Sequence, residues 1–129
     1  MNKILVEVSV GELLDKISIL EIKKEKIKDP KKLKFITDEH SILKVQLDQN
    51  VKSDDKLNSL FKSLKEINAK LWVIEDNKRL CEKNSDFTEN FIKLSRNVHF
   101  LNDDRAKIKL ELNNHTGSKI KEIKEYTSY

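Results

Sequence analysis

Three clusters of charged and polar side chains are the places in this chain where chemistry could occur. The first combines Glu21, His40 and Arg105, which interrupt helical seams that are otherwise apolar. A carboxylate, an imidazole and a guanidinium that face one another inside a helical bundle could transfer a proton or bind an anion. The same side chains could equally form a structural layer of ion pairs that fixes the register of the helices.

The second cluster places the only tryptophan of the chain, Trp72, beside several charges. Glu75, Asp76 and Arg79 follow it in the same predicted helix, and Arg96 lies opposite in the next one. If exposed, the i,i+4 pair of Glu75 and Arg79 is worth only ~0.2–0.5 kcal/mol. Only three of the 26 basic residues are arginines, and a guanidinium offers a bidentate fork that lysine lacks. Two of them beside carboxylates indicate a binding role, and the alternative is a set of solvated ion pairs.

The third cluster is the run Asn102, Asp103, Asp104 and Arg105 in the middle of a predicted helix. Asn and Asp are poor residues for a helix interior because their side chains compete for backbone hydrogen bonds. Their presence indicates that a contact requires these side chains, and the alternative is a solvated helix face.

The sequence lacks the common motifs of metal and phosphate sites. It contains no glycine-rich phosphate loop, no H-E-x-x-H and no nucleophile elbow. Glu111 and His115 form an isolated i,i+4 pair, so the paired Glu-x-x-His motifs of di-iron bundles are missing. We therefore predict no metal and no cofactor, and whether the chain is an enzyme stays open.

Composition restricts the class of protein. The 129 residues are 37% hydrophobic and 37% charged, with two glycines and one proline, which excludes collagen-like and many-stranded β proteins. The net charge is +4, but the dense lysine run at 23–34 contains Glu25 and Asp29 and no arginine. Nucleic-acid binding is therefore not expected.

The single cysteine and the distribution of apolar residues bear on location. Cys81 has no partner for an internal disulfide, which is typical of cytoplasmic proteins. The first residues resemble no signal peptide, and no run of about 18 apolar residues predicts a membrane span. We expect a cytoplasmic protein, in the host cytoplasm if a phage encodes it.

Apolar periodicity predicts an all-α fold, an antiparallel up-down helical bundle in one domain. We expect two shorter helices of about 19 residues and two longer ones of about 30, the third with the heptad spacing of bundles and coiled coils. The expected order is an extended arm (1–8), a bundle (9–117) that turns near Pro30, near 51–52 and near 85, and a short C-terminal helix or tail (118–129). Ser9 with Glu12 would cap the first helix, Ser53 would cap the third, and Ser118 would cap the last helix, Lys119 to about Tyr126.

Two further predictions concern the ends of this bundle. The starts of the first and last helices, at Ser9 and Ser118, should be neighbours, and with Lys16, Lys119 and Lys121 they would form a patch that tolerates anions. At the other end, residues 72–96 would project beyond the shorter helices as an apolar hairpin. Exposed apolar patches usually mark interfaces, so we predict a homodimer through this hairpin, with the Ile4–Val8 arm as a second contact. The alternative is a bend near Trp72–Asp76 that folds the hairpin back on its own bundle.

Five strings in the sequence occur together in one known family. They are SVGELLDKI (9–17), ILEIK (19–23), LWVIED (71–76), NDDRAKIK (102–109) and GSKIKEIKEY (117–126). In order and spacing the chain resembles a small, uncharacterised, mainly helical family of bacterial and phage proteins, with His99 where the family has tyrosine. The resemblance implies no particular reaction, although bacterial members tend to accompany cell-surface polysaccharide functions. Its motifs contain the candidate ligand-binding residues Glu12, Asp15, Lys16, Glu21, Glu75, Asp76, Asn102, Asp103, Arg105, Lys124 and Tyr126, to which the second cluster adds Arg79 and Arg96.

Two functions from different classes follow. The first is a non-catalytic helical interaction module that forms homo-oligomers. The alternative is a binding protein or enzyme for a small anionic or sugar-phosphate-like ligand, linked to cell-surface polysaccharide metabolism. Convergence of the arginines and motif carboxylates on one concavity would favour the alternative, and their dispersal would favour the module.

Overall fold

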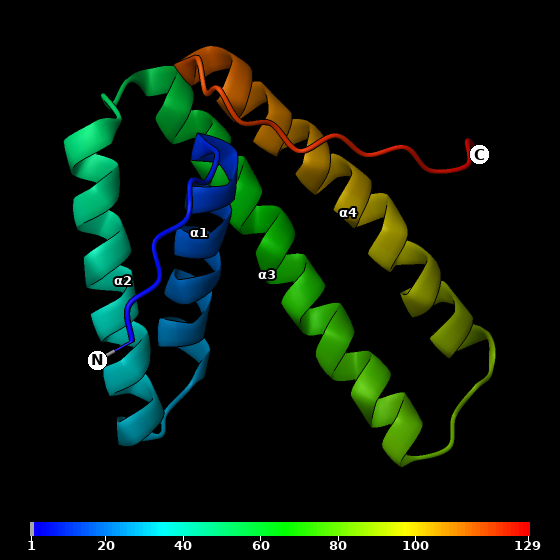
Figure 1. The fold of residues 1–129 in the computed structure, drawn as a ribbon. Helices are drawn as coiled ribbons and strands as arrows, with labels where there is room; N and C mark the ends of the chain where they lie inside the picture. Colours follow the sequence, from blue (N-terminus) through cyan, green and yellow to red (C-terminus); the bar gives the residue numbers. More distant parts are fainter. Residues whose placement is uncertain (1) are drawn as a thin grey trace.

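The computed structural model describes residues 2–129 and contains four helices and, within that range, no strand. They are α1 (Val10–Lys26), α2 (Pro30–Asn50), α3 (Asp55–Lys83) and α4 (Glu89–Thr116), with 17, 21, 29 and 28 residues. Successive helices run in opposite directions (Figure 1). The predicted all-α bundle is therefore confirmed.

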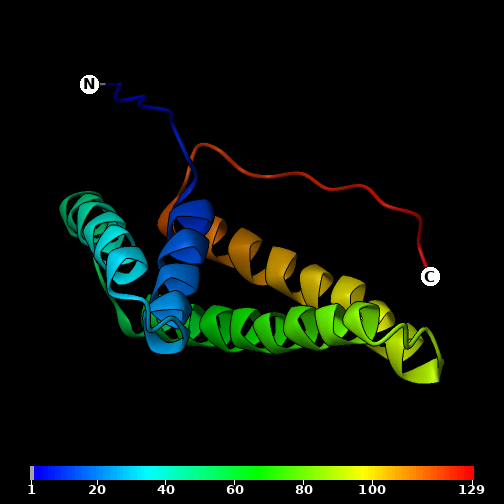
Figure 2. The same ribbon diagram turned by 90° about the horizontal axis from the view of Figure 1, so that it is seen from below.

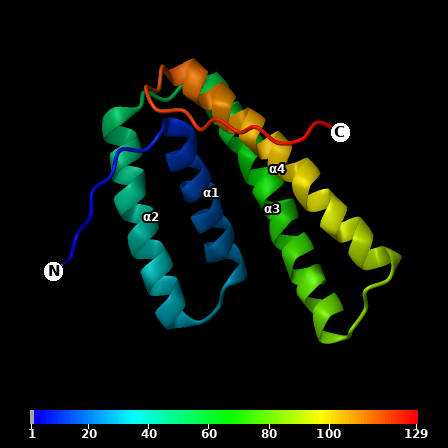
Figure 3. The same cartoon turned by 45° about the vertical axis from the view of Figure 1, so that its right-hand side comes forward.

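The four helices form two hairpins that meet at one end and diverge toward the other (Figures 1 and 3). We call the shared end, where α1 begins and α4 ends, the closed end. The backbone of α1 packs against α2, α3 and α4, whereas the backbone of α2 packs against α1 alone. Figure 2 shows α2 on the outer side of α1, away from the α3–α4 hairpin. The central helix α1 is therefore the element that positions side chains from the others.

The hydrophobic core lies at the closed end. Its buried leucine and isoleucine side chains come from all four helices: Leu14, Ile17, Leu47, Leu57, Leu64 and Leu112. These residues continue the apolar seams read from the sequence, and their burial provides the main driving force for folding. Within residues 2–129, no helix is long and apolar enough to cross a membrane.

Local capping interactions set the helix boundaries. Ser9 caps α1, since its Oγ accepts a hydrogen bond from the Glu12 backbone N–H at 3.0 Å, while the Glu12 carboxylate bonds elsewhere. The third helix is capped by Asp54, which accepts from the Leu57 N–H at 2.8 Å, and not by Ser53 as predicted. Gly117 ends α4 in the left-handed conformation with φ of 69°, as a C′ glycine does.

The predicted C-terminal helix is wrong. Residues 118–129 contain no helix and run as an extended tail along α4 (Figure 1). Side chains of this tail are used in contacts with the bundle: Ser118 Oγ accepts from the Val10 N–H at 3.3 Å, and Lys121 Nζ donates to Asn114 Oδ1 at 2.8 Å. The predicted helix would have only about two turns, which is unstable on its own. The contacts with the bundle therefore determine the extended conformation of the tail.

Candidate functional site

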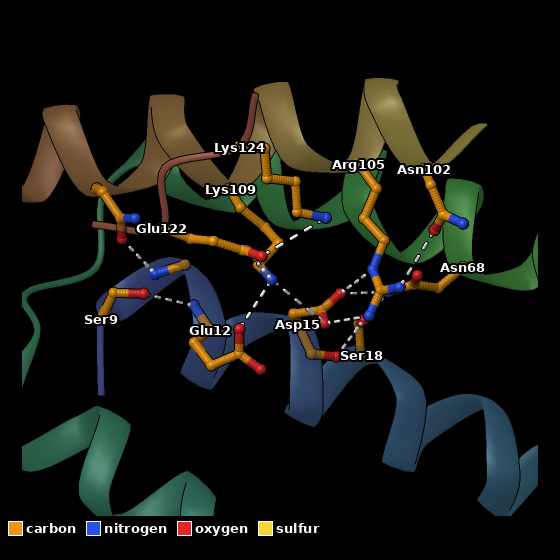
Figure 4. A network of polar contacts seen from close by, with 12 residues as sticks. Ser9, Glu12, Asp15, Ser18, Asn68, Asn102, Arg105, Lys109, Glu122 and Lys124 are labelled. Atoms are coloured by element: carbon orange, nitrogen blue, oxygen red, sulfur yellow. Dashed lines mark hydrogen bonds and ion pairs between the residues drawn. The ribbon is translucent and has the colours of Figure 1, made fainter. Parts of the chain in front are cut away.

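A buried polar network joins α1, α3 and α4 near the closed end (Figure 4). Its centre is Asp15 of α1, whose side chain is only 1% exposed. Arg105 of α4 donates from Nε to Asp15 Oδ1 at 2.9 Å and from Nη2 to Asp15 Oδ2. Asn68 of α3 donates from Nδ2 to Asp15 Oδ1 at 2.9 Å. One carboxylate thus binds two other helices, with the bidentate geometry that favours arginine over lysine.

Lys109 extends this network to the C-terminal tail. Its Nζ lies 2.8 Å from Glu12 Oε2, 3.1 Å from Glu122 Oε2 and 4.0 Å from Asp15 Oδ2. The Lys109 side chain is 10% exposed, so its charge is largely removed from water and three carboxylates surround it. The tail is therefore attached to α1 and α4 through a shared cation.

A close approach of α1 and α4 allows these side chains to meet. The Gly11 backbone N–H donates to Asn113 Oδ1 at 2.7 Å. A Cβ atom on Gly11 would lie 2.5 Å from the Lys109 carbonyl oxygen, closer than atoms can pack. The glycine in the first sequence string is thus the position at which the two helix backbones approach.

The network keeps its members charged at neutral pH. Burial raises the pKa of Asp15, but hydrogen bonds from Arg105 and Asn68 outweigh it and leave that pKa below its usual 3.8. Burial lowers the pKa of Lys109, but bonds to Glu12 and Glu122 outweigh it, and the pKa is raised. Among residues 2–129, no buried side-chain nitrogen or oxygen lacks a hydrogen-bond partner. The network therefore acts as a set of structural ion pairs and offers no free base or nucleophile.

The predicted layer of Glu21, His40 and Arg105 is wrong in its third member. Glu21 Oε2 lies 3.3 Å from His40 Nε2 and Glu21 Oε1 lies 3.3 Å from Lys65 Nζ, whereas Arg105 binds Asp15. Asp15 and Glu21 are six residues apart, which turns a helical side chain by about 240°. Glu21 therefore points toward α2 and the side of α3, and Asp15 points toward α4.

The second predicted cluster forms one wall of a groove. The groove has a volume of about 410 Å³ and lies between α1, α3 and α4. We call it the arginine groove, and it is lined by Ile19, Ile22, Asn68, Leu71, Trp72, Glu75, Asp76, Arg79 and Arg105. Arg79 Nη1 donates to Glu75 Oε2 at 2.8 Å in an exposed i,i+4 pair. The guanidinium of Arg96 instead lies over the Phe100 ring, 5.9 Å from its centroid.

The remaining candidates are dispersed. Asn102 Oδ1 accepts from Arg105 Nη1 at 3.4 Å and Asp103 accepts from the Tyr129 hydroxyl. Lys124 Nζ lies 3.5 Å from Glu122 Oε1, while Lys16 and Tyr126 are exposed. Four candidates thus line the arginine groove and several others belong to the network behind it.

The predicted anion patch at the start of α1 is wrong. Ser9 and Ser118 are neighbours there, as expected, but the amides of Val10, Gly11 and Glu12 already donate to Ser118, Asn113 and Ser9. A helix start attracts an anion through backbone amides that have no hydrogen-bond partner. Here side-chain oxygens already accept these hydrogen bonds, so no amide is left for an anion.

Sequence reasoning did not select Ser18, Asn68, Lys109, Asn113 or Glu122 as site residues. A signal existed for Lys109, which lies four residues after Arg105 and therefore on the same helix face. Lys109 and Glu122 also stand inside the motif strings quoted for the family. Asn68 carried no comparable signal, because a single asparagine in a helix is usually a surface residue.

The fold and the network define a small four-helix protein whose central helix is bound to two others and to the tail by buried ion pairs. Residues 4–129 match the model of a family described as a family of unknown function, DUF6165. The chain belongs to this family, which confirms the resemblance found in its sequence. No curated protein and no solved structure matches the chain significantly.

Proposed function

We propose that the chain is a non-catalytic helical interaction module that forms a homodimer through the distal part of the α3–α4 hairpin. The observation that carries this proposal is an apolar groove of about 640 Å³ between α3 and α4 of that hairpin. We call it the apolar groove, and it is lined by Ala69, Lys70, Val73, Ile74, Asn97, Phe100 and Leu101.

Within residues 2–129, Tyr129 of the tail packs edge-to-face on Phe100 at the α4 side of the groove, with ring centroids 5.4 Å apart, and the rest of the groove is open. The α1–α2 hairpin diverges from it (Figure 3), and α3 is one continuous helix from Asp55 to Lys83, so the hairpin does not fold back on the bundle. Beyond the groove, Leu80, Phe87 and Ile92 are each 54% exposed. Large exposed apolar patches on soluble proteins commonly mark interaction sites.

A second copy of the chain suits this surface. Two hairpins that pack face to face produce a four-helix arrangement, and a two-fold axis is the commonest symmetry of homo-oligomers. The exposed apolar residues of the arm, Ile4, Leu5 and Val6, would supply the second contact. The paired charges of the polar network support the non-catalytic part of the proposal, since a general base must be free to accept a proton.

The test is the molar mass in solution at micromolar concentration, by light scattering coupled to gel filtration. We expect twice the chain mass of 15.1 kDa. Val73→Glu introduces a charge at a 46% exposed position of the apolar groove and should yield the monomer. Phe35→Glu on α2, at a 77% exposed position outside the groove, is the matched control and should remain dimeric. A wild-type mass of 15.1 kDa at every concentration would refute the proposal.

A further inference from the structure

We infer that the arginine groove binds a small anion that also carries hydroxyl groups, a ligand of the sugar-phosphate type. This site is separate from the proposed dimer surface, because the arginine groove and the apolar groove share no lining residue. The inference combines the free donors of Arg105, the charge balance of the groove and the position of Trp72.

Arg105 presents unused hydrogen-bond donors to the groove. A guanidinium has five N–H groups. Within residues 2–129, the structure assigns two of them to Asp15 and one, from Nη1, to Asn102 at 3.4 Å. One N–H on Nη1 and one on Nη2 remain without an assigned partner, and guanidinium N–H groups of this kind donate to carboxylates and phosphates. The Arg105 side chain is 28% exposed and lines the groove, so a ligand can reach these donors.

The network behind the groove holds Arg105 in place before any ligand arrives. Asp15 binds one edge of the guanidinium and is itself fixed by Asn68. Binding a ligand to an arginine that is already ordered avoids the entropic cost of immobilising a long side chain. The same Asp15 contact raises the pKa of Arg105, so the cation is permanent.

The charges that line the groove restrict the ligand to a particular chemistry. Glu75 and Asp76 line the groove together with Arg79 and Arg105. Asp15 already pairs with Arg105 from behind, so a bare anion meets no net positive charge. A ligand with an acidic group for Arg105 and hydroxyl groups for the carboxylates satisfies both kinds of side chain. Carboxylates accept hydrogen bonds from hydroxyls, as arginines donate to phosphates.

The apolar wall of the groove suits the ring of such a ligand. Trp72, Leu71 and the isoleucines Ile19 and Ile22 line the same space, and an indole offers a large flat apolar surface. A sugar ring presents C–H groups on its faces and hydroxyls at its edge. The volume of about 410 Å³ lies within the range of about 300–1,000 Å³ for small-molecule sites.

Trp72 is the only tryptophan of the chain and lines the groove, so a ligand bound there should change its fluorescence. We would titrate the protein with glucose 1-phosphate and glucose 6-phosphate, and separately with glucose and inorganic phosphate. We expect a saturable change in Trp72 emission with at least one sugar phosphate, at a concentration at least tenfold below that required for glucose or phosphate. No change with either sugar phosphate would overturn the inference. Phosphate binding as tightly as the sugar phosphates would overturn the role of the hydroxyls.

Two groove variants and one control test the assignment to Arg105. Arg105→Lys keeps the charge but removes the fork, and we expect affinity to fall at least tenfold. Arg79→Gln removes the cation of an exposed ion pair that the fold does not require, and we expect it to lower affinity too. If Arg105→Lys does not fold, the affinity of Arg79→Gln alone tests the inference. Arg96→Gln removes the remaining arginine, outside the groove, and should leave affinity unchanged. Equal affinity in wild type and both groove variants would overturn the inference. Val73→Glu should still bind the ligand, which separates this test from that of the dimer.

Discussion

At the scale of single residues, Asp15 determines how the network behaves. Its carboxylate is buried and bound by Arg105 and Asn68, and its backbone oxygen accepts from Ser18 Oγ at 2.7 Å. A buried ion pair gains little over an apolar pair of equal shape, but the loss of one partner leaves a buried charge without compensation. The charge of Asp15 is therefore needed because Arg105 and Lys109 are present.

Removal of the Asp15 charge should destabilise the fold at neutral pH. We expect Asp15→Asn to lower the free energy of unfolding at pH 7 by about 3 kcal/mol, the lower end of the range for a broken buried pair. The pKa of Asp15 is lowered in the folded state relative to 3.8, so its contribution is complete above about pH 4 and is lost as the pH falls through the folded value. The variant should therefore show a weaker acid dependence than the wild type.

Urea unfolding between pH 7 and pH 3 measures both effects. Glu75→Gln is the matched control, because it removes the carboxylate of the exposed pair with Arg79 and should cost no more than about 0.5 kcal/mol. If Asp15→Asn were as stable as Glu75→Gln at pH 7, the network would not contribute as described.

The sequence contained Asp15 and Arg105 as candidates but not their pairing. The motif strings marked both residues, and the seams marked Arg105, since a polar residue in an apolar seam is conspicuous. Their partners depended on how α1 is rotated about its own axis. Helix order and loop positions estimate the height of a side chain along the bundle, but they contain no information on that rotation.

At the scale of elements, Gly11 controls the packing of α1 on α4. A Cβ at this position would approach the Lys109 carbonyl to 2.5 Å and Asn113 Oδ1 to 3.0 Å. The first of these is backbone of α4, so the helices must separate. We expect Gly11→Ala to lower the free energy of unfolding by about 1–3 kcal/mol, as overpacking does, measured by urea denaturation.

Gly117→Asn is the control for this substitution. Gly117 has no atom within 4 Å of an added Cβ but adopts a φ of +69°, a conformation that asparagine tolerates better than most residues. This variant should lose less stability than Gly11→Ala. A Gly11→Ala variant of wild-type stability would show that α1 and α4 do not approach as closely as the structure indicates.

Helix existence was more predictable than helix ends or the tail. Asp29 and Pro30 stop one helix and start the next, because the residue before proline avoids helical geometry and proline suits the first turn. A helix was wrongly predicted in the tail because Ser118 resembles an N-cap. Its hydroxyl accepts from the Val10 N–H, a contact that requires the tertiary structure, and donates to the Ile120 carbonyl at 3.0 Å within the tail itself.

At the scale of the whole molecule, α1 holds the fold together and α2 is an outer layer. The sequence suggested a bundle in which helices adjacent in sequence pack side by side, because short loops imply antiparallel pairs. A short loop between α2 and α3 does not imply that the two helices pack along their length. Leu47 is the only buried residue of α2, whereas α1 buries seven residues. This asymmetry depends on long-range packing and leaves no distinct pattern in the periodicity of α2.

The outer position of α2 predicts that it opens before the rest of the protein. Its backbone packs only on α1, and its side chains Phe35, Ile42 and Val45 are at least 50% exposed. Segments with few buried contacts open with a smaller free energy than global unfolding. In hydrogen exchange followed by mass spectrometry, amides of residues 33–45 should exchange at least tenfold faster than those of residues 14–22 in α1. The control is Leu47→Ala, which should speed exchange in α2 more than in α1. Equal protection of α2 and α1 would contradict the prediction and would mean that another molecule covers α2 in solution.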